Sequence, residues 1–163
     1  MEVALFESEI REDNKIVSAW LLYYPERRKE YWRRREEIIH NSAPLYNSVP
    51  GGKNKIGDPT GRKGQKLADL QETERWLELV EEVERRLSWK MQVFLNLRRE
   101  YRHARGRQGW TAAVQWRFSH EVAERLGKRP EDTWVESRNT FTRWWDRIVE
   151  YTVRLAAKNG LLC

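Results

Sequence analysis

Apolar side chains recur at intervals of three and four residues along most of this chain, and strict alternation of apolar and polar residues is absent. This interval matches the 3.6-residue turn of an α-helix, whereas a half-buried strand requires a period of two. We therefore predict an all-α protein. The first stripe of this kind consists of Val3, Phe6, Ile10, Ile16, Trp20 and Tyr24.

Proline, glycine and short polar residues mark where the predicted helices begin and end. Pro25 suits the first turn of a second helix. Asp58 as N-cap and Pro59 as first residue open a long central helix that we expect to reach Ser88. The remaining signals are Ser88 as the cap of the next helix, Gly127 as the stop of a helix over 110–126, and Ser137 and Gly160 as cap and stop of the last helix.

Residues 41–57 are rich in Asn, Ser, Pro and Gly and lack helical periodicity, which predicts a flexible linker. It divides the chain into an N-terminal helical region, 1–40, and a region 58–163 that holds the central helix and the C-terminal helices. Gly52 and Gly57 have the spacing of a phosphate-binding loop, but Asp58 stands where that loop requires a lysine. The stretch is thus predicted to be a connector that ends in a helix cap.

Composition narrows the class of partner. The chain has 31 Lys and Arg against 25 Asp and Glu, a formal net charge of +6, which favours an anionic partner such as nucleic acid. No apolar run approaches the roughly 20 residues that span a bilayer, and the N-terminus is acidic rather than a basic leader, so we expect no membrane partner and a cytoplasmic location.

The sequence offers little for catalysis or for a bound cofactor. One cysteine and three histidines do not form a cluster of metal ligands, and the carboxylates mostly alternate with arginines at helical ion-pair spacing. The histidines have no evident serine or aspartate partner. We therefore predict a protein that is not an enzyme and that has no catalytic residue, metal or cofactor.

Two sets of residues are candidates for DNA contact. The last predicted helix has an inward stripe, and its opposite face carries Arg, Asn and Thr, which reach base edges and phosphates. A second, arginine-rich set follows the predicted fourth helix and is a candidate for phosphate contact, with a solvated surface as the alternative. The stripe comprises Phe141, Trp144, Trp145, Ile148, Tyr151 and Leu155; the opposite face Arg138, Asn139, Thr142, Arg143, Arg147 and Arg154; the second set Arg98, Arg99, Arg102, Arg105 and Arg107.

Two stretches, "GGKNKIGDPTGRKGQKL" and "TFTRWWDRIVEYTVRLAAKNGLL", resemble the RinA family of phage transcriptional activators. The resemblance implies a C-terminal helix-turn-helix related to the promoter-reading region of sigma factors. Its recognition helix would cover residues 137–151. The positions that match the family's core are Thr140, Phe141, Arg143 and Trp144, followed by Asp146, Arg147 and Ile148; Phe141, Trp144 and Ile148 would pack, and Arg138, Asn139, Thr142 and Arg143 would read bases.

The sequence departs from that family in one place. About 30 residues separate Trp110 from Phe141, against the 3–4-residue turn of a minimal helix-turn-helix. Either the bracing helix is extended and the turn carries the insertion "GKRPEDTWVE", or the two helices are not a standard motif.

The leading hypothesis is a DNA-binding transcriptional activator that acts in the cytoplasm of a bacterial host. Its partner would be duplex DNA, and its N-terminal helices would contact host RNA polymerase or a second copy in a homodimer. Two alternatives remain open: the small terminase subunit, a phage DNA-packaging initiator, and an adaptor that binds polymerase or a sigma factor without DNA affinity of its own.

Overall fold

The computed structural model describes residues 2–40, 59–104 and 109–163. These residues form α-helices and one short 3-10 helix, without a strand, so the all-α prediction is confirmed. The elements are α1 (Glu2–Leu22), α2 (Tyr24–His40), α3 (Pro59–Arg86), α4 (Trp89–Glu100), α5 (Gly109–Leu126), η1 (Pro130–Thr133) and α6 (Asn139–Lys158).

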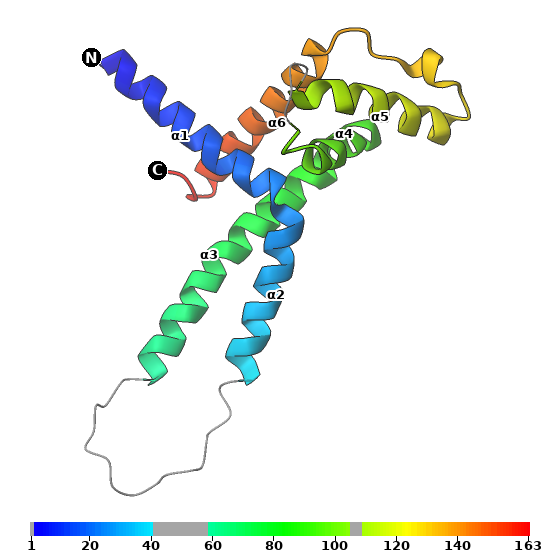
Figure 1. The fold of residues 1–163 in the computed structure, drawn as a ribbon. Helices are drawn as coiled ribbons and strands as arrows, with labels where there is room; N and C mark the ends of the chain where they lie inside the picture. Colours follow the sequence, from blue (N-terminus) through cyan, green and yellow to red (C-terminus); the bar gives the residue numbers. More distant parts are fainter. Residues whose placement is uncertain (1, 41–58, 105–108) are drawn as a thin grey trace, which may run out of the picture.

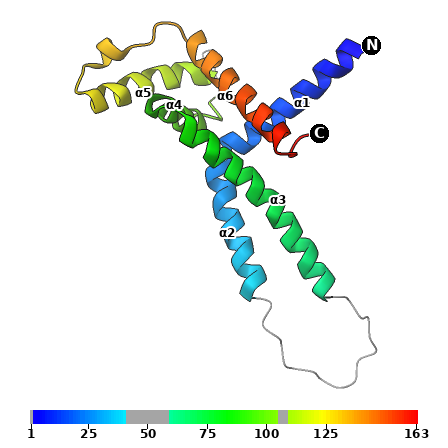
Figure 2. The same cartoon turned by 180° about the vertical axis from the view of Figure 1, so that it is seen from behind.

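Two parts of the molecule extend from a helical body in different directions (Figure 1). The body contains α4, α5, α6, the C-terminal half of α3 and the inner end of α1. The N-terminal half of α3 and α2 lie side by side and form an arm, while the N-terminal half of α1 extends from the body elsewhere. Seen from behind, the C-terminal residues lie beside α1 (Figure 2).

One core holds the body together and combines residues from both sides of the predicted linker. Val17 and Leu21 of α1 are fully buried in it. Its aromatic centre is Phe94 of α4, whose ring is stacked 5.9 Å from Phe141 of α6. The described residues 2–40 therefore share a core with the region that follows the predicted linker.

A smaller cluster joins the two helices of the arm. Tyr31 of α2 is buried there with Leu70 and Leu77 of α3. At the base of the arm, Trp20 and Trp76 stack with 5.3 Å between ring centroids and 3° between planes. Trp20 belongs to α1 and Trp76 to α3, so this stacked pair joins the arm to α1 at the base of the arm.

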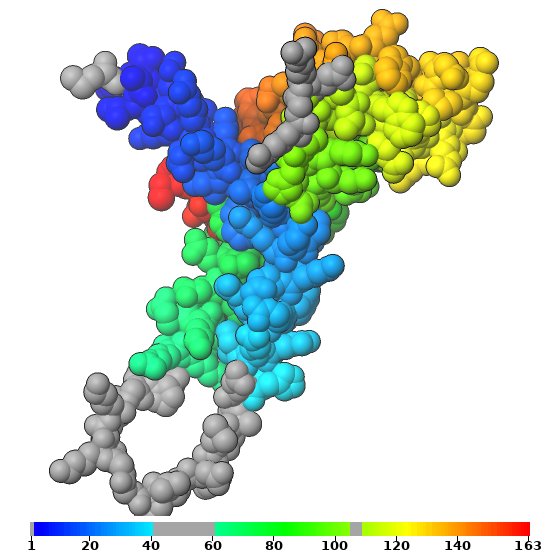
Figure 3. Space-filling model, in the orientation of Figure 1, coloured from blue at the N-terminus to red at the C-terminus, as the bar shows by residue number. Residues whose placement is uncertain are grey.

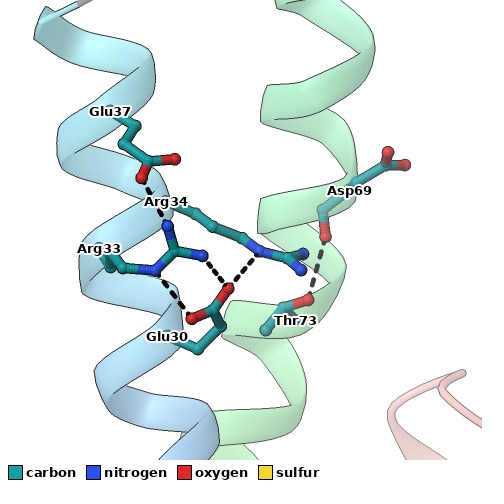
Figure 4. A network of polar contacts seen from close by, with 6 residues as sticks. All are labelled: Glu30, Arg33, Arg34, Glu37, Asp69 and Thr73. Atoms are coloured by element: carbon teal, nitrogen blue, oxygen red, sulfur yellow. Dashed lines mark hydrogen bonds and ion pairs between the residues drawn. The ribbon is translucent and has the colours of Figure 1, made fainter.

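The surface of the arm carries a network of charged side chains on α2 (Figure 4). Glu30 accepts hydrogen bonds from Arg33 Nε at 2.9 Å and from Arg34 Nε at 2.9 Å, and Arg33 also donates to Glu37 at 2.5 Å. The hydrogen bonds from Arg33 and Arg34 lower the pKa of Glu30 to about 2. These residues are i, i+3 and i, i+4 neighbours, so the network supports α2 locally.

Most of the predicted helix ends are confirmed. Ser88 is the N-cap of α4 and its side chain accepts a hydrogen bond from the Met91 amide. Gly127 and Gly160 follow the ends of α5 and α6 with φ of 63° and 70°, the left-handed conformation that glycine adopts without a steric cost.

One predicted cap is wrong. Arg138, not Ser137, is the N-cap of α6, and no side chain caps that end. Ser137 lies one residue before the cap. It contributes its backbone carbonyl oxygen to the helix start, where it accepts from the Thr140 amide at 3.1 Å, and its side chain caps no amide. The predicted cap at Asp58 and the predicted linker 41–57 lie outside the described residues.

Candidate nucleic-acid interface

Helix α6 packs on α1, α3 and α5 along one face. The predicted inward residues Phe141, Trp145 and Ile148 are buried. The face continues through Thr152, whose Oγ1 donates to the carbonyl oxygen of Ile148 at 2.7 Å, so that this buried hydroxyl is satisfied within the helix. The prediction that Tyr151 faces inward is wrong, since this residue is 37% exposed.

The opposite face of α6 is exposed to solvent. The predicted base-reading residues Arg138, Asn139, Thr142 and Arg143 lie there, as does the predicted DNA-contacting residue Arg147. We call these five residues the "α6 outer face". Among the residues that the structure describes, no salt bridge occupies its three guanidinium groups. Arg154, two turns after Arg147, is paired with Glu150 at 2.5 Å. The α6 outer face therefore presents its cations without ion-pair partners in the described part of the chain.

Three residues of the second predicted set, Arg98, Arg99 and Arg102, lie in the described part of the chain, and Arg99 is buried there. Arg99 is only 6% exposed. It forms an ion pair with Glu84 of α3, and its Nε donates to the carbonyl oxygen of Leu21 at 2.7 Å. Because its charge is already neutralised inside the protein, the prediction that Arg99 contacts phosphate is wrong.

The guanidinium of Arg98 lies between two indole rings, 4.3 Å from the centroid of Trp110 and 4.9 Å from that of Trp145. Burial lowers its pKa to about 10. Its Nε and Nη1 atoms are shielded from solvent and have no hydrogen-bond partner among the described residues. Arg98 is thus a cation–π contact between α4, α5 and α6, and the prediction of a phosphate contact is wrong here too.

Arg102 is held in a similar way at the end of α4. It donates to Glu26 of α2 at 2.6 Å and to the carbonyl oxygen of Arg99 at 3.0 Å, and its guanidinium lies 4.9 Å from the ring centroid of Tyr23. These contacts hold Arg102 within the fold, and its predicted phosphate contact stays a prediction. Arg105 and Arg107 lie outside the described residues.

The burial of Arg99 could have been predicted from its position in the sequence. Arg99 follows Leu95 by four residues, and Leu95 is one of the buried residues of α4. A charged residue at the next position of an apolar stripe points towards the core. Its burial then depends on a partner that comes from a distant part of the chain.

A long connection joins α5 to α6, the helix of the candidate interface, and packs against α5. Residues 127–138, which include η1, separate α5 from α6. Thr133 Oγ1 donates to the carbonyl oxygen of Ser119 at 2.7 Å, and Gln115 Nε2 donates to that of Val135 at 2.7 Å. The connection is therefore tied back onto α5, and α5 and α6 are not joined by the short turn of a minimal helix-turn-helix.

Several tryptophans lie at the surface rather than in the core. Trp116 on α5 is 53% exposed, and its ring lies 4.1 Å from that of His120. Trp89 is 38% exposed, with Lys90 and Arg125 each 5.7 Å from its ring centroid. Trp76 and Trp145, by contrast, are buried in the core.

The described residues contain no group of three His, Cys, Asp or Glu side chains that could hold a metal ion. Nor is any helix in the described ranges long and apolar enough to cross a membrane. Comparisons with protein-family models, with curated proteins and with solved structures find no match to the chain.

Proposed function

We propose that this protein binds duplex DNA through the α6 outer face and acts as a phage-type transcriptional activator like those of the RinA family. The observation that carries the proposal is the contrast between the two faces of α6. One face is anchored in the core by Phe141, Trp145 and Ile148. The other presents exposed guanidinium and amide groups without ion pairs to the described residues.

The residue types on the α6 outer face suit the major groove. Arginine pairs bidentately with guanine, and asparagine pairs in the same manner with adenine. Arg138, Asn139, Thr142 and Arg143 lie in the first turns of the helix, which is the part that recognition helices present to base edges. A rigid helix whose other face is packed on three neighbours loses little conformational entropy when it docks.

The net charge of +6 supplies the general attraction to a polyanion. Since Arg98, Arg99 and Arg102 are engaged within the fold, the phosphate contacts of the proposed complex come from the α6 outer face and from other exposed cations. The role as activator, through polymerase recruitment, rests on the resemblance of the two sequence stretches.

Salt-dependent binding to a labelled duplex tests the proposal. We expect Arg138→Ala/Arg143→Ala/Arg147→Ala to weaken binding and to reduce the slope of log affinity against log salt by about 1 for each phosphate that the variant no longer binds. The matched control is Arg86→Ala/Arg117→Ala/Arg129→Ala, which removes the same charge from arginines that are already paired with Glu82, Glu121 and Asp132. Absence of binding by the unmodified protein at low salt, or equal losses of affinity in both triple variants, contradicts the proposal.

A further inference from the structure

The N-terminal half of α1 projects away from the body of the molecule (Figure 3). Val3 is 72% exposed, Phe6 64% and Ile10 43%. The same stripe continues along α1 to Val17 and Leu21, which are fully buried in the core. The body thus covers the apolar stripe of α1 at Val17 and Leu21 and leaves it exposed at Val3, Phe6 and Ile10.

A helical segment of this length has little stability of its own in water, because helices shorter than about 12–15 residues are marginal without tertiary packing. The local ion pairs of α1 add little, since Arg11–Glu7 is 4.0 Å and Lys15–Glu12 is 3.9 Å, both between strongly exposed side chains. A covering surface would stabilise this part of α1 by burying its apolar stripe.

The charge of the same segment indicates what kind of surface can cover it. Residues 2–13 contain five carboxylates, Glu2, Glu7, Glu9, Glu12 and Asp13, and one cation, Arg11. Pairing of this segment with itself across a two-fold axis brings these carboxylates together. A surface that is both basic and apolar matches it better.

Such a surface exists on the outer part of the arm. Residues 29–40 and 61–69, called the outer arm below, contain seven Lys and Arg against four Asp and Glu. Trp32 is 46% exposed there, with Arg28 and Arg35 at 5.2 and 5.3 Å from its ring, and Leu67 is 40% exposed. Lys63 and Lys66, four residues and one residue before Leu67, are exposed as well.

We infer that two copies of this chain form a dimer in which the N-terminal half of α1 of each copy packs along the outer arm of the other. Within one chain the two segments extend in different directions from the body, as both views show, so an intramolecular contact does not form (Figures 1 and 2). Two reciprocal contacts of this kind close the assembly at two copies.

Sedimentation velocity over a range of protein and salt concentrations tests the inference in the absence of DNA, so the result is independent of the proposed function. We expect a concentration-dependent dimer that dissociates as salt is raised. Phe6→Asp in α1 and Lys63→Glu/Lys66→Glu in the outer arm should each weaken the dimer at least tenfold. Trp116→Asp, at an exposed aromatic position on α5, should leave it unchanged.

Mixing the two defective variants gives the sharpest result. The variant with Lys63→Glu/Lys66→Glu retains an intact α1, and the Phe6→Asp variant retains an intact arm, so one of the two contacts can re-form. We expect the mixture to dimerise more strongly than either variant alone. A monomeric unmodified protein at all concentrations overturns the inference. A dimer that Phe6→Asp abolishes and the arm variant leaves intact also overturns it, because α1 then pairs with something other than the arm.

Discussion

Arg99 of α4 donates a hydrogen bond from Nε to the backbone carbonyl oxygen of Leu21 in the last turn of α1, at 2.7 Å. In a continuing helix that oxygen accepts from the amide four residues later, which here is Pro25 and has no N–H. Arg99 therefore provides the donor that the chain lacks where α1 ends and α2 begins. The arginine ties three helices together, since it also pairs with Glu84 of α3.

The first prediction concerns this pair of residues. Arg99→Leu leaves the carboxylate of Glu84 and the carbonyl oxygen of Leu21 without their partner, and we expect it to lower the free energy of unfolding by about 3 kcal/mol. Urea denaturation followed by circular dichroism measures this. Arg143→Ala is the surface control and should change stability by less than about 0.5 kcal/mol. An equal effect of both substitutions would show that Arg99 is not a structural residue.

The second prediction is that Arg143 contributes to DNA affinity and not to stability. If the α6 outer face reads base edges, Arg143→Ala costs roughly 1–3 kcal/mol of binding at the preferred site and flattens sequence preference. Selection of bound fragments from the source genome identifies that site, and titration of the preferred and a scrambled duplex gives the two affinities. An equal decrease in affinity for both duplexes reassigns Arg143 to the DNA backbone.

Gly127, with a positive φ, and Gly64, inside a helix, should respond in opposite ways to substitution by alanine. Gly127 has φ of 63° and open space around its Cα, so Gly127→Ala meets no clash and is destabilising through the backbone alone, by about 1 kcal/mol. Gly64 is inside α3, also with open space, and Gly64→Ala should stabilise by up to about 1 kcal/mol. Thermal denaturation of both variants checks the signs, and a shift of the same sign in both contradicts these expectations.

Tyr24 makes stability depend on alkaline pH. Its burial, together with the hydrogen bond that its hydroxyl donates to Glu81 at 2.7 Å, raises its pKa from 10.0 to about 12. The folded state therefore holds this proton more tightly than the unfolded state. The resulting stabilisation is complete below pH 10 and is lost as the pH rises from about 10 towards 12.

Tyr24→Phe isolates this effect, because the variant lacks the titrating hydroxyl. The difference in urea midpoint between the unmodified protein and Tyr24→Phe should be constant from about pH 7 to 9 and then decrease towards about pH 11. A difference that stays constant across this range would mean that the Tyr24 hydroxyl ionises equally easily in both states.

Features of this protein that depend on near neighbours in the chain could be predicted from its amino-acid sequence. The three- and four-residue spacing of apolar side chains predicted the helices, because each turn places those positions on one side. Ser88 and Gly127 marked helix ends correctly, since capping and positive φ are properties of one or two residues. The exposed set on α6 followed from the same periodicity.

Which arginines are exposed and which are buried in ion pairs depends on the tertiary fold. Arg99 and Arg143 both belong to arginine-rich stretches, yet Arg99 meets Glu84 and Leu21, whereas Arg143 remains exposed. The stripe of α1 likewise looks uniform in the sequence, although its inner part is buried and its outer part is not. Both outcomes depend on where residues from distant parts of the chain arrive, and the local pattern contains no information about those partners.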